Sequence, residues 1–324
     1  MKNDKYCTAN SQAPTFTKKC NAIVTGASRG IGRATALALA AAGWGHITIC
    51  ADRDAAGLQE TERIILKSSG AAVHGNPEMP GLDVAPGSSE KPKLETTPEN
   101  TASPDSHHLQ AEASGQSKAQ GSLSKGLDCQ KTCRVLSMLG DISDEAFVQE
   151  LVKRACEESG APVDTLVNNA GISIVGLVQD LSYSDWHRIL DVNLSSVFLT
   201  SRAIIPGMLQ EQAGHIINVS SMWGRVGASC EAAYSATKGG VIAFTQALAK
   251  ELAPSCISVN AVAPGCVDTV MNDHLTSEEK AALAEEIPAG RFASPSEIAS
   301  VIVGIAQAPA YMTGQVIGID GGYI

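Results

Sequence analysis

Short apolar runs alternate with longer amphipathic or alanine-rich stretches along most of the chain. Seven runs of four to six residues predict strands: Asn21–Thr25, His46–Ala51, Arg134–Leu139, Thr165–Asn168, His215–Ser220, Ser258–Ala263 and Val316–Asp320. Six stretches between them predict helices: Gly32–Ala42, Ala55–Lys67, Ser143–Glu158, Ser184–Gln210, Tyr234–Ala253 and Ser296–Ala308. Repeated strand–helix alternation implies right-handed crossovers and a parallel sheet with helices on both faces.

Two segments lack this alternation. Residues 1–19 are polar and patternless, and residues 71–131 contain six prolines but no Phe, Tyr or Trp. Such compositions bury too little apolar area to offset the entropy lost on ordering, so both segments are predicted to be disordered. Residues 20–324, with 71–131 as an insertion in a surface loop, then form a single α/β domain. Its doubly wound, seven-stranded parallel sheet is of the Rossmann type, with the ligand beyond the carboxyl ends of the strands.

Composition narrows the classes of partner and compartment. The 324 residues carry a formal net charge of −10, which argues against nucleic acid or an anionic membrane as a partner. No run approaches the 18 apolar residues of a membrane span, and the first twenty residues lack the apolar core of a secretory signal. Nine cysteines without a CxxC pair favour free thiols in a reducing cytoplasm, and no metal site is expected.

A glycine-rich turn joins the first predicted strand to the first predicted helix. Residues 23–32 read IVTGASRGIG, with glycines at positions 26, 30 and 32. Glycine allows the backbone to approach a pyrophosphate closely, and the helix N-terminus offers N–H groups and a positive dipole. The position of the turn, between first strand and first helix, indicates a dinucleotide site.

The end of the second predicted strand carries Asp52 and Arg53. Asp52 could bind the ribose 2′-hydroxyl of NAD and repel the 2′-phosphate of NADP, or it could cap the following helix. Arg29 and Arg53 could instead pair with a 2′-phosphate. Arg29 and Arg53 supply two positive charges, whereas Asp52 supplies one negative charge and can lie past the ribose. This balance favours NADPH, with NADH as the alternative.

The third and fourth predicted strands also end in polar residues. Either Asp141 or Ser143 caps the next helix, or Asp141 bonds the adenine amino group. The fourth strand ends in Asn168-Asn169-Ala170-Gly171, which suits a tight turn whose backbone faces the nucleotide, or a turn of no functional role.

The pair Tyr234 and Lys238 lies one helical turn apart, and Ser221 stands thirteen residues before the tyrosine. A lysine ammonium beside a phenol lowers the phenol pKa, which makes tyrosine usable as an acid–base group near neutral pH. Ser221 can donate a hydrogen bond to a carbonyl oxygen that gains charge. This combination predicts carbonyl reduction.

Together these motifs resemble the classical short-chain dehydrogenase/reductase family over nearly all of the domain. The resemblance implies an NAD(P)H-dependent oxidoreductase in which Tyr234 donates the proton, Lys238 tunes it and holds the nicotinamide ribose, and Ser221 orients the carbonyl. Asn193 matches the family's helix asparagine, which holds a water of the proton relay. The implied cofactor-binding residues are Gly26, Ser28, Arg29, Gly30, Ile31, Gly32, Asp52, Arg53, Asp141, Ile142, Asn169, Ala170, Gly171, Tyr234, Lys238, Pro264, Gly265, Val267 and Thr269.

The chain is similar overall to bacterial 3-oxoacyl-acyl-carrier-protein reductases. The stretch Ser220–Lys238 more narrowly resembles the elongation factor P 5-aminopentanone reductases, which reduce a ketone on a protein-bound lysine modification. Carrier-protein reductases place arginines on the rim of the site, and the matching positions here hold Gln210, Glu211, Gln212, His215 and Ser255. An acidic carrier protein would gain little from such a rim.

Two residues near the catalytic motif are candidates for substrate contact. Glu231 could face a substrate ammonium or be a solvated loop carboxylate, and Trp223 could form a pocket wall or pack within its loop. The substrate is therefore expected to be a ketone, such as 5-aminopentanone-modified elongation factor P. Alternatives are a 3-oxoacyl-acyl-carrier-protein substrate, broad-specificity alcohol oxidation with NAD, and a non-catalytic NADPH-binding scaffold. The helices at 184–210 and 234–253 match those that pair between subunits in the family, which implies a homotetramer or homodimer.

Overall fold

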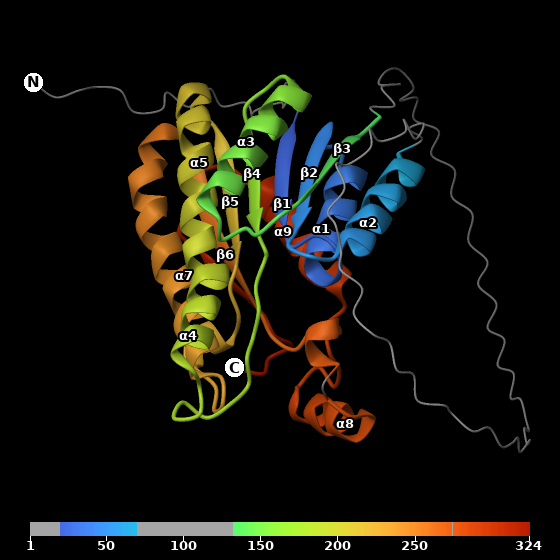
Figure 1. Ribbon diagram of the computed structural model, residues 1–324, viewed down its shortest axis with the longest axis vertical. Helices are drawn as coiled ribbons and strands as arrows, with labels where there is room; N and C mark the ends of the chain where they lie inside the picture. Colours follow the sequence, from blue (N-terminus) through green and yellow to red (C-terminus); the bar gives the residue numbers. More distant parts are fainter. Residues whose placement is uncertain (1–19, 70–131, 274) are drawn as a thin grey trace, which may run out of the picture. The chain divides into compact units, whose positions relative to one another are not determined.

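The computed structural model describes residues 20–69, 132–273 and 275–324. The segments 1–19 and 71–131, which the sequence predicts to be disordered, lie outside these described residues. Within the described part, the strands form one parallel sheet in the order β3-β2-β1-β4-β5-β6-β7 (Figure 1). They are β1 (Asn21–Thr25), β2 (His46–Ala51), β3 (Arg134–Leu139), β4 (Thr165–Asn168), β5 (Gly214–Val219), β6 (Ile257–Pro264) and β7 (Val316–Ile319).

This architecture confirms the predicted fold class. The strand order reverses between β1 and β4, which are neighbours in the sheet. That reversal is the topological switch point at which doubly wound sheets bind their ligands. The first four strands have the predicted bounds, and the last three differ by one residue at one or both ends.

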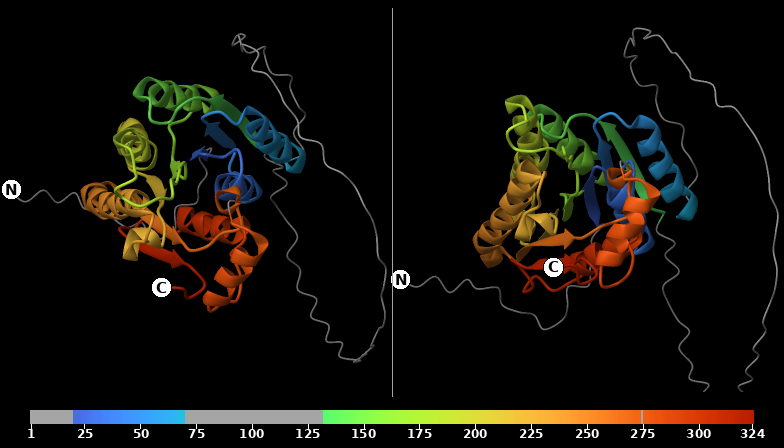
Figure 2. Two further views of the ribbon diagram at one scale, coloured as in Figure 1. Left: turned by 60° about the horizontal axis from the view of Figure 1, so that its bottom comes forward. Right: turned by 90° about the horizontal axis from the view of Figure 1, so that it is seen from below.

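Helices cover both faces of the sheet (Figure 2). On one side lie α1 (Gly30–Ala41), α2 (Ala55–Ser68) and α9 (Pro295–Ala306), and on the other lie α3 (Glu145–Ser159), α5 (Ser196–Glu211) and α7 (Ala232–Leu252). Successive strand residues point to opposite faces, so Val24 and Ile217 join the core under α1 and α9, whereas Ile23 and Ile216 join the core under α3 and α5. Two apolar cores therefore sandwich one sheet.

The helix predicted over residues 184–210 is interrupted. It consists of α4 (Tyr183–Leu190), a π-helical turn (Asp191–Ser195) and α5. The whole run Tyr183–Glu211 is long and apolar enough to cross a membrane by length and composition alone. Its buried residues Ile204 and Met208 pack in the core, so the apolar content is explained by the fold.

Two helices were absent from the sequence-based prediction. The short α6 (Trp223–Val226) follows Ser221, and α8 (Ser277–Glu286) follows β6. The start of α8 has a capping box in which Thr276 and Glu279 satisfy each other's backbone N–H groups. The Thr-x-x-Glu spacing is a recognisable helix start, so the sequence contained the signal for α8.

Two buried histidines lie at the amino-terminal edge of the sheet. His46 Nδ1 is 3.0 Å from Asn21 Oδ1, and His215 Nδ1 is 2.8 Å from Ser258 Oγ. Burial lowers the pKa of each histidine to about 4. Nearby Asp164 has its pKa raised by burial to about 6.

We expect the free energy of unfolding to fall by about 2 kcal/mol between pH 7 and pH 5 through these three groups. The unfolded histidines bind protons below pH 6.5 while the folded ones do not until about pH 4, so acid favours the unfolded state. Asp164 opposes this in part, because its folded form takes up a proton near pH 6. Urea titrations at both pH values measure the difference. A His215→Gln variant should show a smaller pH dependence, and an unchanged dependence would contradict the assignment.

Candidate active site

The structure brings Ser221, Tyr234 and Lys238 together beyond the carboxyl end of β5. Ser221 follows that strand, and Tyr234 and Lys238 lie on the first two turns of α7. All three are buried. The Ser221 side chain is hydrogen-bonded to the Tyr234 phenol, and Lys238 Nζ lies 5.7 Å from the centre of the tyrosine ring. Lys238 Nζ donates to the Val219 carbonyl at 2.8 Å, which fixes the amine.

The expected lowering of the phenol pKa is wrong for this structure. Burial raises the pKa of Tyr234 to about 12; Ser221 acts to lower it and the Glu231 carboxylate to raise it. Burial also lowers the pKa of Lys238 to about 8. Desolvation of the phenolate thus outweighs the hydrogen bond from Ser221. A protonated phenol at neutral pH is the state that a proton donor needs.

Asn193 reaches the same place from the π-helical turn. Its Oδ1 accepts a hydrogen bond from Ile172 N at 2.8 Å, and its Nδ2 donates to Ile172 O at 2.9 Å and to Thr237 Oγ1 at 3.2 Å. A Cβ built on Gly171 would lie 3.3 Å from both Asn193 Oδ1 and Lys238 Nζ. Asn193 and Lys238 therefore flank one backbone position. Single π turns are common at functional sites.

The glycine turn is shaped by close backbone approaches. Gly26 has φ +66°, and a Cβ on Gly32 would lie 2.3 Å from the Gly26 carbonyl oxygen. Asn169 Nδ2 donates to Thr25 O at 3.0 Å and Gly26 O at 3.2 Å, while Thr25 Oγ1 accepts from Ala170 N at 3.0 Å. The amide side chain after β4 therefore holds the turn in place from the neighbouring strand.

These residues fit a dinucleotide pyrophosphate. Helix α1 begins at Gly30, and its N-cap residue Arg29 is extended. An arginine side chain has no acceptor for the first N–H groups of a helix, so a phosphate can take that role. A Cβ on Gly30 would lie 3.3 Å from Thr269 Cγ2, which places the predicted nicotinamide contact beside the turn. At the end of β6, a Cβ on Gly265 would lie 2.7 Å from the Cα atom of Asp320, so only glycine fits there.

The structure corrects the predicted helix caps near the cofactor's adenosine end. Asp54 rather than Asp52 caps α2, accepting from Gly57 N at 2.9 Å. Asp144 rather than Asp141 or Ser143 caps α3, accepting from Ala146 N at 2.9 Å. The exposed carboxylate of Asp52 therefore stays at the strand end, where it can act on a bound nucleotide.

Arg188 of α4 is a residue that sequence reasoning missed. Its Nη1 lies 2.7 Å from Asp141 Oδ2 and its Nη2 lies 3.3 Å from Asp52 Oδ2. Burial tends to raise the pKa of Asp141, but hydrogen bonds from Ser143 and Arg188 outweigh it and leave that pKa low. Arg53 Nε also reaches Asp52 Oδ2 at 3.4 Å. No local motif marks Arg188, because its partners are distant in sequence.

The predicted substrate residues have defined contacts. Glu231 Oε1 accepts a hydrogen bond from Ser173 Oγ at 2.7 Å. The Trp223 ring meets the Tyr323 ring edge-on at 5.9 Å, and the Tyr323 hydroxyl donates to Glu286 Oε2 at 2.9 Å. The pKa of Cys266 is raised by burial and by the charges of Glu286 and Glu231, so two carboxylates act on one thiol. Glu286, Tyr323 and Cys266 were missed because no sequence motif marks them, and they meet only through contacts between residues far apart in the chain.

The positions compared with a carrier-protein rim lie elsewhere than expected. Gln210, Gln212 and Ser255 precede β5 and β6, whereas Tyr234 lies beyond the carboxyl end of β5. Residues before and after a strand occupy opposite edges of a parallel sheet. Their lack of positive charge therefore does not describe the mouth of this chain's own site and does not disfavour an acidic carrier protein there.

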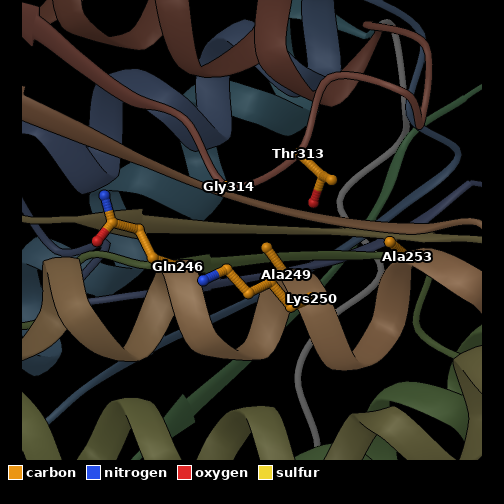
Figure 3. Close-up of a pocket in the computed structure, with 6 residues that line it drawn as sticks. All are labelled: Gln246, Ala249, Lys250, Ala253, Thr313 and Gly314. Atoms are coloured by element: carbon orange, nitrogen blue, oxygen red, sulfur yellow. The ribbon is translucent and has the colours of Figure 1, made fainter.

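A cavity of about 460 Å³ is not part of this site. Figure 3 shows its lining residues, Gln246, Ala249, Lys250, Ala253, Thr313 and Gly314. Ala249 stands fifteen residues after Tyr234 on α7, which corresponds to about 22 Å along a helix.

The doubly wound sheet, the glycine turn and the buried Ser–Tyr–Lys group define a Rossmann-fold oxidoreductase. The family model described as enoyl-(acyl carrier protein) reductase matches residues 113–324. The chain belongs to the classical short-chain dehydrogenase/reductase family. It is accordingly an oxidoreductase acting on CH–OH or C=O groups, and the family implies NAD(P) as its cofactor.

Similar proteins include an oxidoreductase and several 3-oxoacyl-[acyl-carrier-protein] reductases. "Uncharacterized oxidoreductase YmfI" of Bacillus subtilis is 44% identical over 163 residues, covering 50% of this chain and 67% of that protein. The 3-oxoacyl-[acyl-carrier-protein] reductase FabG of Thermotoga maritima is 40% identical over 185 residues, covering 57% of this chain and 75% of that protein. A crystal structure provisionally assigned as a gluconate dehydrogenase of Agrobacterium tumefaciens superposes with a TM-score of 0.70 at 28% identity, covering 94% and 95% of the two chains.

Proposed function

We propose that the protein is an NADPH-dependent reductase of a ketone that carries a positively charged amine. The 5-aminopentanone group on a modified lysine of elongation factor P is such a substrate. The observation that carries this proposal is the pair of carboxylates Glu231 and Glu286. Glu231 acts on the Tyr234 phenol, and Glu286 accepts a hydrogen bond from Tyr323, whose ring meets Trp223. Carboxylates beside a substrate favour an ammonium and disfavour an anion.

The chain's own residues perform the proton chemistry. The cofactor, when bound, supplies the hydride for the carbonyl carbon. Ser221 donates a hydrogen bond to the carbonyl oxygen, and Tyr234 transfers its phenolic proton to that oxygen. The Lys238 ammonium stabilises the phenolate that remains. Asn193, held by Ile172 and Thr237, positions the water through which the proton is replaced.

A second candidate is the reduction of 3-oxoacyl groups on acyl carrier protein. Its support is the similarity to the FabG proteins of Thermotoga maritima and other bacteria. An acyl chain has no ammonium, so this function makes no use of the Glu231 and Glu286 charges. Substrate charge therefore separates the two candidates.

The test compares purified protein on three kinds of ketone while NADPH absorbance is followed. The substrates are aminopentanone-modified elongation factor P, an acetoacetyl thioester, and a small amino ketone with its N-acetylated form. We expect higher kcat/KM on the modified protein than on the thioester. We also expect N-acetylation, which removes the charge, to raise KM at least about 10-fold, the scale of one favourable charge contact.

A matched pair of variants assigns the effect to the site. Glu231→Gln should raise KM for the amino ketone and leave the N-acetylated form unchanged. Glu285→Gln, which removes an exposed carboxylate beside Glu286 on α8, should change neither. Faster turnover of the thioester than of the modified protein would instead establish the carrier-protein function.

We further propose that copies of the chain pair through α5 and α7 as a homodimer or homotetramer. The apolar side chains of Phe198 and Leu209 on α5 are exposed, and contact with a second copy would remove them from water. Light scattering at micromolar concentration should give two or four times the mass of one chain. A monomer would contradict this pairing, as would an unchanged assembly in a Phe198→Glu variant.

A further inference from the structure

One guanidinium joins the two carboxylates at the adenosine end of the site. Asp52 follows β2 and Asp141 follows β3, and the family resemblance assigns both to the cofactor. Arg188, from the last turn of α4, places Nη1 at 2.7 Å from Asp141 Oδ2 and Nη2 at 3.3 Å from Asp52 Oδ2. The side chains of Arg188 and Asp52 keep 36% and 40% of their surface exposed, so this pair lies at the surface of the site.

The contact changes how Asp52 acts on a nucleotide. A free carboxylate at the end of β2 accepts hydrogen bonds from the ribose hydroxyls of NAD and repels the 2′-phosphate of NADP. Here Arg188 and Arg53 both lie against Asp52 Oδ2. Because Arg188 also pairs with Asp141, the two guanidinium groups balance the charges of the two carboxylates. Their contacts with Asp52 are to its Oδ2 atom.

Further arginines near Asp52 also offset the negative charge at this end of the site. Arg29 and Arg33 lie close enough to Asp54 to lower its pKa, after the larger effect of its hydrogen bond from Gly57 N. Among the described residues here, Arg29, Arg33, Arg53 and Arg188 lie near Asp52, Asp54, Asp141 and Asp144. The guanidinium groups therefore balance the carboxylates, although an acidic residue stands at the position that favours NAD.

We propose that Arg188 determines the nucleotide preference by neutralising Asp52, so that the site accepts the 2′-phosphate of NADPH. Arg188 is a positioning residue that acts through Asp52. The inference rests on the proposed function only in requiring that the chain bind a nicotinamide dinucleotide.

The test is a double-mutant cycle read by nucleotide binding. Dissociation constants for NADPH and NADH are measured by fluorescence titration for the wild type, Arg188→Met, Asp52→Asn and the double variant. We expect Arg188→Met to weaken NADPH binding at least about 10-fold, because the uncovered carboxylate repels the phosphate, and to leave NADH binding within about 2-fold. On the Arg188→Met background, Asp52→Asn should restore most of the lost NADPH affinity.

Each other outcome overturns the proposal. Equal weakening of both nucleotides would show that Arg188 has a structural role. Failure of Asp52→Asn to restore NADPH binding would show that Arg188 contacts the phosphate itself. A wild type that binds neither nucleotide would reject the proposed function as well, whereas an unchanged preference in binding-competent variants rejects this inference alone.

Two controls guard against misfolding. Thermal melting without nucleotide checks each variant, and Arg188→Gln replaces Arg188→Met if the latter fails to fold. Arg154→Met removes another partly exposed guanidinium, which pairs with Glu158 on α3, and should leave both dissociation constants unchanged.

Discussion

The Tyr234→Phe variant is expected to lose at least about 10²-fold in turnover, the range contributed by a positioned general acid. The ring stays buried on α7, so its packing persists, and only the hydroxyl that hydrogen-bonds Ser221 is removed. The Tyr323 phenol beside Trp223 donates its hydrogen bond to Glu286, so it does not replace Tyr234 as the proton donor.

Steady-state NADPH oxidation measures this loss, and nucleotide titration with thermal melting shows whether the variant remains folded and able to bind. Tyr183→Phe is the matched control, because Tyr183 is exposed at the start of α4 and contacts His187. Its turnover should equal that of the wild type. Near-normal turnover in a folded Tyr234→Phe protein would reject the mechanism.

The Gly32→Ala variant is expected to lose nucleotide binding by at least about 10-fold and stability by about 2 kcal/mol, typical of overpacking at a rigid contact. Its new Cβ would lie 2.3 Å from the Gly26 carbonyl oxygen and 2.6 Å from Asn169 Nδ2. Both atoms belong to the hydrogen bond that holds the glycine turn, so relief of the clash requires the turn to move.

Melting temperature and NADPH titration measure both effects. Gly304→Ala on α9 provides the control, because a Cβ there meets nothing within 4 Å and the position is exposed within the helix. That variant should bind NADPH normally and gain up to about 1 kcal/mol from helix propensity. Equal behaviour of the two variants would show that the Gly26–Gly32 contact is unimportant.

The strands and the glycine turn were predictable because their signals are local. A short buried run such as Thr165–Asn168 can only be a strand in this pattern, and its bounds were confirmed. Helix starts were harder. Asp141, Ser143 and Asp144 are all good N-caps within four positions, and only the backbone direction after β3 selects Asp144.

Contacts between distant residues account for the rest. Arg188 and Asp52 are 136 residues apart, so no local sequence motif predicts their ion pair. Tyr323 and Glu286 meet only because the chain end folds back beside α8. The phenol pKa also depended on burial, since a sequence motif places Lys238 near Tyr234 but does not state how much water each retains.

The π-helical turn at Asp191–Ser195 lets the two helices that it joins, α4 and α5, take rotations about the helix axis that are independent of each other. An α-helix advances by about 100° per residue, and a π turn accommodates one residue more than the α-helical repeat. The angular phase of α4, which presents Arg188 to Asp52 and Asp141, is thereby set independently of the phase of α5, which presents Ile204 and Met208 to the core. Deleting one residue between 191 and 195 would join the two phases. A single rotation of the joined helix could then not place both Arg188 against its carboxylates and Ile204 and Met208 in the core.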